Sequence, residues 1–219
     1  MYHLGSMHVK RPASARRSKD RSSKLTASRP RRGTPAQTRE RLVAAAAELF
    51  NRVGFHGTDS NRIAAKAGYS TGTFYKHFKD KREIFLAAYE AWVSSEWEAV
   101  SAELTGGGSP PAMARRLVML SIEFHTRWRG FRASLLELVF SDAEVRRFYR
   151  RQRRRQLDVM RELRARIGSP VGSREDDAIH LFTSERTFDA FAQDELRELG
   201  LDRKIVIEAM VQKVQSMLV

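Results

Sequence analysis

The chain has 219 residues, of which 42% are apolar, enough for a buried core divided between one small and one larger domain. It contains no cysteine, which excludes disulfides and thiolate metal sites and makes a reducing cytoplasm the simplest location. The formal net charge at pH 7 is +14, and no apolar run approaches the roughly 20 residues that span a bilayer, so we expect a soluble protein.

The positive charge is concentrated before the first predicted helix. Residues 10–33 hold ten Lys or Arg residues against a single acid, Asp20. The segment is rich in Ser, Pro and Ala, so we predict that residues 1–33 are disordered in isolation. They form either a solubilising leader or, as we favour, a basic arm that lies on nucleic-acid phosphates or in a minor groove. The first six residues, MYHLGS, resemble a cloning remnant.

The first predicted helix begins at Thr34. Thr34-Pro35-Ala36-Gln37 combines a capping box with proline at the first helical position, and Gly54 ends the helix. Apolar residues recur along it at spacings of three and four, which predicts one buried face made of Leu42, Ala46, Leu49, Phe50 and Val53.

Residues 58–78, TDSNRIAAKAGYSTGTFYKHF, predict two short helices joined by a tight turn. Gly68 stands where a residue after a helix adopts positive φ without steric cost, and Ser70 can cap the second helix. Phe74 and Phe78 are one turn apart and point inward, where we expect them to pack on the first helix together with Ile63. The opposite face carries short or hydrogen-bonding side chains, as a helix in a DNA groove requires.

This region resembles the tetracycline-repressor (TetR) family of bacterial transcriptional regulators. The matching stretches are AAAAELFNRVGFHGT, IAAKAGYSTGTFYKHF and KDKREIF, within residues 34–85. Ser60 and Tyr69 depart from the residues most frequent in the family, but neither change removes a DNA contact. The resemblance implies a DNA-binding domain over residues 34–80 and a ligand-binding and dimerisation domain over residues 81–219.

The resemblance also assigns DNA contacts to individual residues. Asn61, Thr71, Gly72 and Thr73 fall at base-facing positions. Residues at backbone-contacting positions are Ser60, Tyr75, Lys76, His77 and Lys81. Tyr75 has a core position as its alternative. No other ligand stands at metal spacing around His77, so we predict neither a metal site nor a cofactor.

A connecting helix is predicted from Asp80 to about Leu104. Asp80 and Glu83 form a capping box, and Ile84, Phe85, Ala88 and Trp92 mark its inward stripe. The run of glycines at 106–108 lacks the Lys-Ser/Thr ending of a phosphate-binding loop and follows no strand, so we expect a flexible loop.

The remainder predicts helices at about 111–128, 131–140, 142–167, 174–199 and 202–218, with no strand pattern. The fold class is therefore all-α, with about nine helices. The resemblance implies a small-molecule inducer inside this bundle and a homodimer through the last two helices. Candidate pocket residues, each with the core as its alternative, are Trp92, Leu117, Phe124, Trp128, Phe131, Leu135 and Phe182.

The arginine-rich stretch Arg146–Arg155 leaves three interpretations open. It could be a second nucleic-acid site, a solvated face, or a group of arginines that attracts an acidic inducer. His125 and His180 are isolated in helical context, so we expect core or pocket-edge positions for them and no metal pair.

The sequence thus predicts a homodimeric repressor that binds a palindromic operator and is released by an inducer. A sequence-independent DNA-packaging protein is the first alternative, although it leaves the uncharged Thr71-Gly72-Thr73 face unexplained. A helical enzyme is the second, but no nucleophile with its base, carboxylate pair or metal set stands at a workable spacing.

Overall fold

The computed structural model describes residues 33–218, and within them the chain is helical with no strand, which confirms the predicted all-α class. The predicted basic arm lies outside the described residues except for Gly33. No helix in the described part is both long enough and apolar enough to cross a bilayer.

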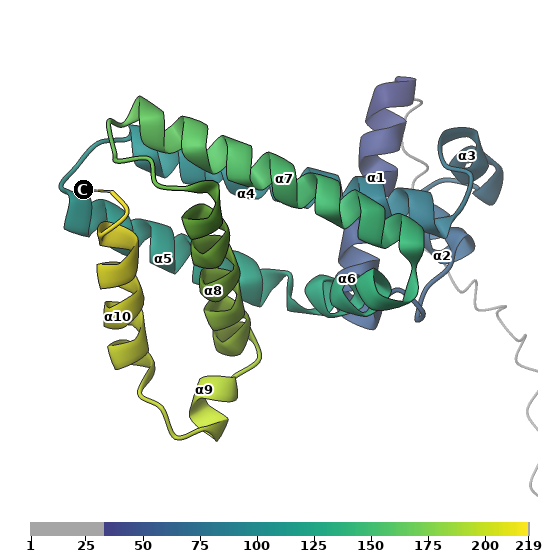
Figure 1. Cartoon of the computed structure of the whole chain (residues 1–219). Helices are drawn as coiled ribbons and strands as arrows, with labels where there is room; N and C mark the ends of the chain where they lie inside the picture. Colours follow the sequence, from purple (N-terminus) through teal and green to yellow (C-terminus); the bar gives the residue numbers. More distant parts are fainter. Residues whose placement is uncertain (1–32, 219) are drawn as a thin grey trace, which may run out of the picture.

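Ten helices follow one another along these residues (Figure 1). Their bounds are α1 Pro35–Val53, α2 Ser60–Lys66, α3 Thr71–His77, α4 Lys81–Thr105, α5 Pro110–Arg127, α6 Arg129–Ser141, α7 Ala143–Arg166, α8 Arg174–Ala192, α9 Glu195–Glu198 and α10 Arg203–Gln215.

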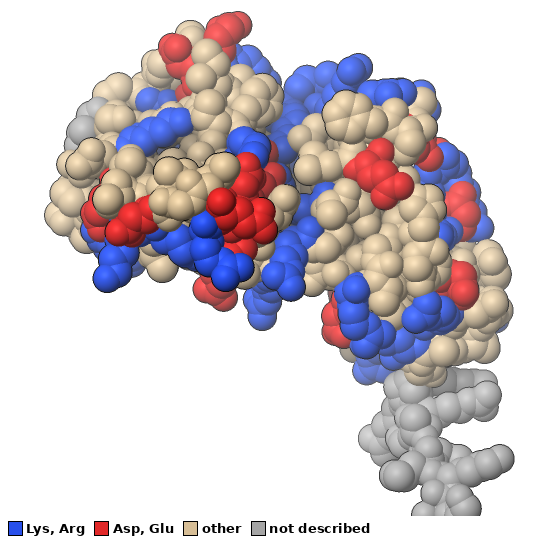
Figure 2. All heavy atoms as spheres, turned by 90° about the horizontal axis from the view of Figure 1, so that it is seen from below, with Lys and Arg blue, Asp and Glu red and all other residues tan. Residues whose placement is uncertain are grey.

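The helices form two lobes joined by long helices. The first three helices lie at one end, α4 and α7 run side by side along the molecule, and α5 packs against α8 and α10 at the other end (Figure 1). Seen from below, the surface is hollowed between the two lobes, and Lys and Arg side chains border the hollow (Figure 2). With 25 residues, α4 is about 37 Å long and reaches from one lobe into the other.

The first helix begins as predicted. Thr34 and Gln37 form the reciprocal capping box, and Pro35 occupies the first helical position. Its inward face packs with Ile63, Phe74 and Phe78, which are at most 2% exposed. Val53 was expected on this face but is 36% exposed, because the helix ends there and its last turn passes the edge of the core.

The hydrophobic core does not stop at residue 80. The cluster that begins in α1 continues through Phe85 of α4 to Phe131 of α6, whose rings stack with centroids 4.6 Å apart. The proposed boundary between residues 34–80 and 81–219 is thus crossed by continuous packing. A movement of α4 or α6 would be transmitted to the first three helices, since close-packed interiors deform little.

Two details of the predicted helices are wrong. Asp80 accepts a hydrogen bond from the Glu83 backbone N–H at 2.8 Å, but the Glu83 carboxylate turns to the N–H of Lys79 at 2.7 Å, so the predicted capping box is only half formed. The single helix expected over 174–199 is divided into α8 and α9, which raises the count from about nine to ten. Asp194 breaks it by adopting a left-handed conformation with φ 60°, which Asp tolerates better than most residues.

Candidate nucleic-acid interface and interior cavity

The helix-turn-helix is held by local hydrogen bonds. The Asp59 side chain caps α2 by accepting the N–H of Arg62 at 2.9 Å, and Ser70 caps α3 by accepting the N–H of Thr73 at 3.3 Å. Gly68 lies between them with φ 80°, where a β-carbon would be strained. These contacts are only three residues apart in the chain, which explains why sequence patterns could predict the motif.

The two faces of α3 differ in exposure. Phe74 is fully buried, whereas Tyr75 is 57% exposed and Lys76 is also exposed. Thr71 and Thr73 are half-buried at the start of the helix. A β-carbon added at Gly72 would meet nothing closer than the Ser70 hydroxyl at 3.9 Å, so the protein's own packing does not require glycine there. The face is polar, shallow and open to a partner.

The structure brings two of the predicted base-facing residues together. The Thr71 hydroxyl donates to the Asn61 side-chain oxygen at 2.7 Å, which joins the start of α3 to α2. Thr73 is two residues farther along α3, and its hydroxyl is 3.1 Å from that of Ser70. Within residues 33–218 nothing accepts the amide N–H groups of Asn61, so they could bind an acceptor such as an adenine edge.

The remaining predicted contact residues lie around this centre. Ser60 begins α2, and His77 ends α3; both are half-buried. Lys81 was also predicted to contact the DNA backbone, but its ammonium group is bound within the protein. It donates to the carbonyls of Phe55 at 2.8 Å and Thr58 at 3.0 Å. Burial outweighs the charge of Asp59 and lowers the pKa of Lys81. In this structure Lys81 therefore ties α4 to the loop before α2.

The first three helices and the residues beside them carry an excess of positive charge. Residues 34–81 contain eight Lys or Arg residues and four Asp or Glu residues. Lys79 is exposed directly after α3 and was not among the predicted contacts, although its position next to Lys76 and His77 could have suggested it. This charge would strengthen binding to phosphates in a salt-dependent manner.

A second candidate site is a cavity of about 160 Å³ in the other lobe. It lies between α4, α5, α7, α8 and α10, and most of its lining is apolar, with Trp97, Leu117, Leu163 and Val214 among the residues. Both histidines expected at the core or at a pocket edge, His125 and His180, line it.

The structure does not bring the seven predicted pocket residues into one site. Leu117 lines this cavity, but Trp92, Phe124 and Trp128 line a separate groove between α1, α4 and α5. Phe131 and Leu135 are buried in the core, and Phe182 is 52% exposed. Helical periodicity identifies an inward stripe but does not say which neighbour that stripe meets.

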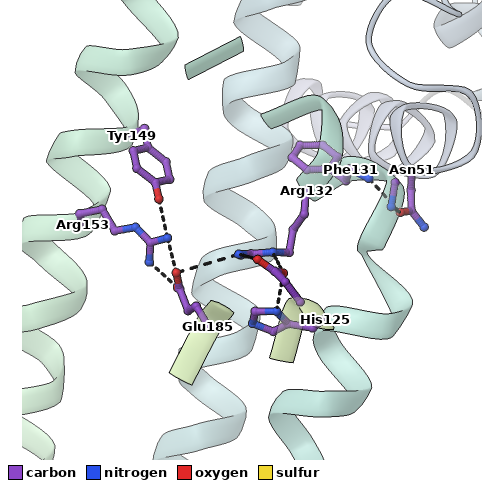
Figure 3. A network of polar contacts seen from close by, with 9 residues as sticks. Asn51, His125, Phe131, Arg132, Tyr149, Arg153 and Glu185 are labelled. Carbon is purple, nitrogen blue, oxygen red and sulfur yellow. Dashed lines mark hydrogen bonds and ion pairs between the residues drawn. The ribbon is translucent and has the colours of Figure 1, made fainter. Parts of the chain in front are cut away.

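Several charged side chains form a network of polar contacts (Figure 3), of which His125 and Glu185 line the cavity. The Arg132 guanidinium donates to both oxygens of Asp189 at 2.6 and 2.7 Å, and Arg153 forms a two-point pair with Glu185. His125 Nδ1 lies 2.9 Å from Asp189. Burial lowers the pKa of His125, so the ring is neutral at pH 7 and Nδ1–H donates to the carboxylate.

Arg153 comes from the arginine-rich stretch of α7. Only this arginine of the stretch is buried, whereas a solvated face holds Arg147, Arg150, Arg151, Arg154 and Arg155. The buried Arg153 also donates to the Tyr149 hydroxyl at 2.6 Å and to Gln156 at 3.0 Å. Its terminal nitrogens are therefore occupied by the protein itself.

Three polar residues that line the cavity were missed or only partly anticipated. Glu96 of α4 has its pKa raised to about 7, chiefly by burial and then by the charge of Glu185. His180 Nε2 and the Ser184 hydroxyl are buried without a hydrogen-bond partner in the described chain. His180 and Ser184 are four residues apart on α8, so one face of that helix presents both, and this spacing was the only available signal.

Asn51 of α1 fixes the turn between α5 and α6. Its side chain donates to the carbonyl of Arg127 at 2.7 Å and accepts the N–H groups of Gly130 and Phe131 at 3.1 and 3.0 Å (Figure 3). These N–H groups stand at the start of α6, where a helix has no internal acceptors for them. Asn51 therefore caps α6 from another helix and fastens the α5–α6 turn to α1.

Comparisons with known proteins agree with the geometry of the first lobe. A family model described as bacterial regulatory proteins, tetR family, matches residues 42–88. The chain is 31% identical over 112 residues to the HTH-type transcriptional regulator AcrR of Shigella flexneri, covering 49% of this chain and 50% of AcrR. The chain spans half or less of the length of the first curated relatives that it matches.

Solved structures match over more of the chain. The fatty acid degradation regulator FadR from Bacillus halodurans aligns with a TM-score of 0.63 and 15% identity, covering 86% of this chain and 98% of FadR. SCO4454, a TetR-family transcriptional regulator from Streptomyces coelicolor, aligns with a TM-score of 0.60 and 23% identity, covering 84% and 95%. At these identities the likeness concerns the fold. AcrR and SCO4454 are named transcriptional regulators, and FadR is named a regulator of fatty acid degradation.

Proposed function

We propose that this chain is a DNA-binding transcriptional regulator of the TetR family, and that it is a repressor that binds a palindromic operator as a homodimer and is released by a small molecule. The observation that carries the proposal is the polar face of α3, where Thr71, Thr73 and Lys76 stand beside Asn61 above a buried Phe74. Short hydroxyl and amide groups can read base edges, and Lys binds phosphate. Such a regulator acts on chromosomal DNA, so the cytoplasm remains the proposed location.

The proposed dimer interface is the outer face of α8 and α10. Ile179 and Phe182 on α8 are 63% and 52% exposed, and Ile205 on α10 is 69% exposed. A twofold pairing of these two helices with their copies would bury this apolar surface. It would also place two reading helices about one turn of DNA apart, which a palindromic operator needs.

The proposed release mechanism uses α4 as a lever. Lys81 ties the start of α4 to the loop before α2, while Glu96, Trp97 and Leu104 farther along the same helix line the cavity. A ligand that favours a different position of α4 would change the spacing of the reading helices. A coupling free energy of about 1–3 kcal/mol would change operator affinity roughly 5- to 150-fold.

The contact residues are tested on a duplex selected from a random DNA library by the protein itself. We expect Thr73→Ala to weaken binding to the selected duplex about 5- to 150-fold, because a base contact contributes about 1–3 kcal/mol. Lys76→Ala should weaken binding to selected and random duplexes alike and reduce the salt slope by about 1. Fluorescence anisotropy at several salt concentrations measures both effects.

Lys204→Ala, on the exposed start of α10, is the matched control and should leave the salt slope unchanged. The dimer should persist in all three variants, as measured by sedimentation. Loss of the dimer in Thr73→Ala or Lys76→Ala would contradict the assigned roles. Equal affinity of the unmodified protein for selected and random duplexes would instead support sequence-independent DNA binding.

The dimer interface has its own test. We expect Phe182→Glu and Ile205→Glu each to shift the protein from dimer to monomer and to weaken operator binding at least tenfold, because two buried carboxylates would face each other across the twofold axis. Both side chains are exposed in the single chain, so the fold should survive. Phe140→Glu is the control, since Phe140 is 82% exposed on α6, away from this face. A dimer that withstands both substitutions would place the interface elsewhere.

A further inference from the structure

The charged side chains that line the cavity are not equally satisfied. Arg164 donates to Asp177 at 2.6 Å and to the carbonyl of Pro170, and Glu185 is paired with Arg153. The Glu96 carboxylate makes no hydrogen bond or ion pair with any residue of the described chain, although it faces the same cavity. Glu96 is therefore the cavity's free charged group.

The charged groups around Glu96 include one carboxylate more than they include cations. Arg132 is taken by Asp189, and Arg153 is taken by Glu185, which leaves Glu96 uncompensated. Burial and the neighbouring carboxylates raise the pKa of Glu96 because they disfavour its ionised form. A positive charge placed in the cavity would supply the missing counter-ion.

An anionic ligand would meet the opposite situation. The terminal nitrogens of Arg132, Arg153 and Arg164 already donate to protein acceptors. A ligand carboxylate would therefore find only the buried Nε–H groups of Arg153 and Arg164, which have no partner in the described chain. It would also approach Glu96 and Glu185, whose charges repel it. The rest of the lining, including Val100, Leu104, Leu163 and Val214, suits an apolar body.

We propose that the ligand of this cavity is an amphipathic amine, whose protonated nitrogen pairs with Glu96 and whose apolar body lies among the aliphatic side chains of α4, α7 and α10. The identification of the ligand class rests on the proposed function, in which this cavity is the inducer site. His180 Nε2 and the Ser184 hydroxyl provide a second polar contact, because both are buried without a partner beside the cavity. They would hydrogen-bond a hydroxyl or carbonyl on the ligand.

The test compares three probes with one apolar body and different head groups: octylamine, octanol and octanoate. Isothermal titration calorimetry on the full chain without DNA, at pH 8, should show octylamine binding at least tenfold more tightly than the other two. Glu96→Gln should remove this preference while changing octanol affinity less than threefold. Glu98→Gln, an exposed carboxylate on the same helix, is the matched control and should bind like the unmodified protein. Thermal unfolding verifies that both variants fold.

The pH dependence gives an independent readout. Octylamine stays protonated up to about pH 10, so its affinity should rise about fivefold from pH 6 to 7, about twofold from pH 7 to 8, and level off above pH 8 as Glu96 loses its proton. Octanol affinity should show no such rise. The ionisable groups around Glu96 and its cavity on the neighbouring helices are His125 on α5, Arg132 on α6, Arg153 and Arg164 on α7, and His180, Glu185 and Asp189 on α8. The pKa of His180 is about 4, chiefly because of burial, so this ring stays neutral. The pKa shifts of Arg132, Arg153, Glu185 and Asp189 keep their charges constant over this pH range, and burial, which lowers the pKa of His125, favours its neutral form.

The proposal is overturned if octanoate or octanol binds as tightly as octylamine, if no probe binds, or if Glu96→Gln keeps the amine preference. Operator release is measured separately, by anisotropy of the selected duplex with and without octylamine. Amine binding without release would support the ligand class and contradict the proposed inducer response. Release by octanoate with no effect of the amine would support an inducer response and overturn the ligand class.

Discussion

Asp189→Ala is expected to lower the free energy of unfolding by about 3–5 kcal/mol, because it leaves a buried guanidinium without its partner. Arg132 is only 8% exposed, and both of its hydrogen bonds to Asp189 would disappear. Glu185, 4.0 Å from Arg132, is already bound by Arg153 and can compensate only in part. His125 would lose its acceptor as well. Urea denaturation at pH 7 measures the change.

The matched control is Asp158→Ala. Asp158 pairs with Arg174 at 2.7 Å, but both side chains are about half exposed, so the loss should be about 1 kcal/mol or less. If both variants lost the same free energy of unfolding, burial of the Arg132–Asp189 pair would not determine how much it contributes to stability.

The same pair predicts a pH dependence with a definite sign. Burial acts to raise the pKa of Asp189, but the hydrogen bonds from His125 and Arg132 outweigh it and hold the pKa at about 2. A lowered carboxylate pKa contributes stability above its unfolded value of about 3.9 and loses it as the pH falls through the folded value. The stability difference between the unmodified protein and Asp189→Ala should therefore shrink between about pH 4 and pH 2.

Gly130→Ala is expected to destabilise the protein by about 3 kcal/mol or more, because a β-carbon at this position would lie 2.0 Å from the backbone carbonyl oxygen of Asn51. Neither partner is the end of a flexible side chain, so α6 must move away from α1. This movement would also stretch the three hydrogen bonds that Asn51 makes to the α5–α6 turn. Thermal unfolding measures the loss of stability.

We also expect Gly130→Ala to weaken operator binding, since α1 and α6 share the core that supports α3. Gly72→Ala separates this effect from direct contact with DNA. Its β-carbon has room within the protein, and alanine should stabilise α3 by up to about 1 kcal/mol. Any loss of operator affinity in Gly72→Ala is then caused by contact of the added methyl group with DNA and not by a change in the protein's stability. An unchanged free energy of unfolding in Gly130→Ala would contradict this prediction, because it would show that α6 can move away from α1 without loss of stability.

The reading motif could be predicted because its determinants are local. Thr34, Asp59 and Ser70 cap their helices through contacts three residues away, and Gly68 takes positive φ as expected. The same reasoning failed at Asp194, because Gln193-Asp194 resembles an ordinary helical sequence and its left-handed turn depends on how α8 meets α9. The sequence predicted that Lys81 contacts phosphate, but in the structure its ammonium group donates to two carbonyls of the loop before α2.

By itself, the sequence determined the all-α class, the helix-turn-helix and the polar face of α3, since caps, turn glycines and apolar spacing act within one or two helical turns. Only the tertiary structure decided that Asn51 caps a helix about 80 residues away, that Arg132 and Asp189 are buried together, and that Glu96 faces a cavity without a counter-ion. These outcomes depend on which helices pack together, and burial then determines the energy of each charge.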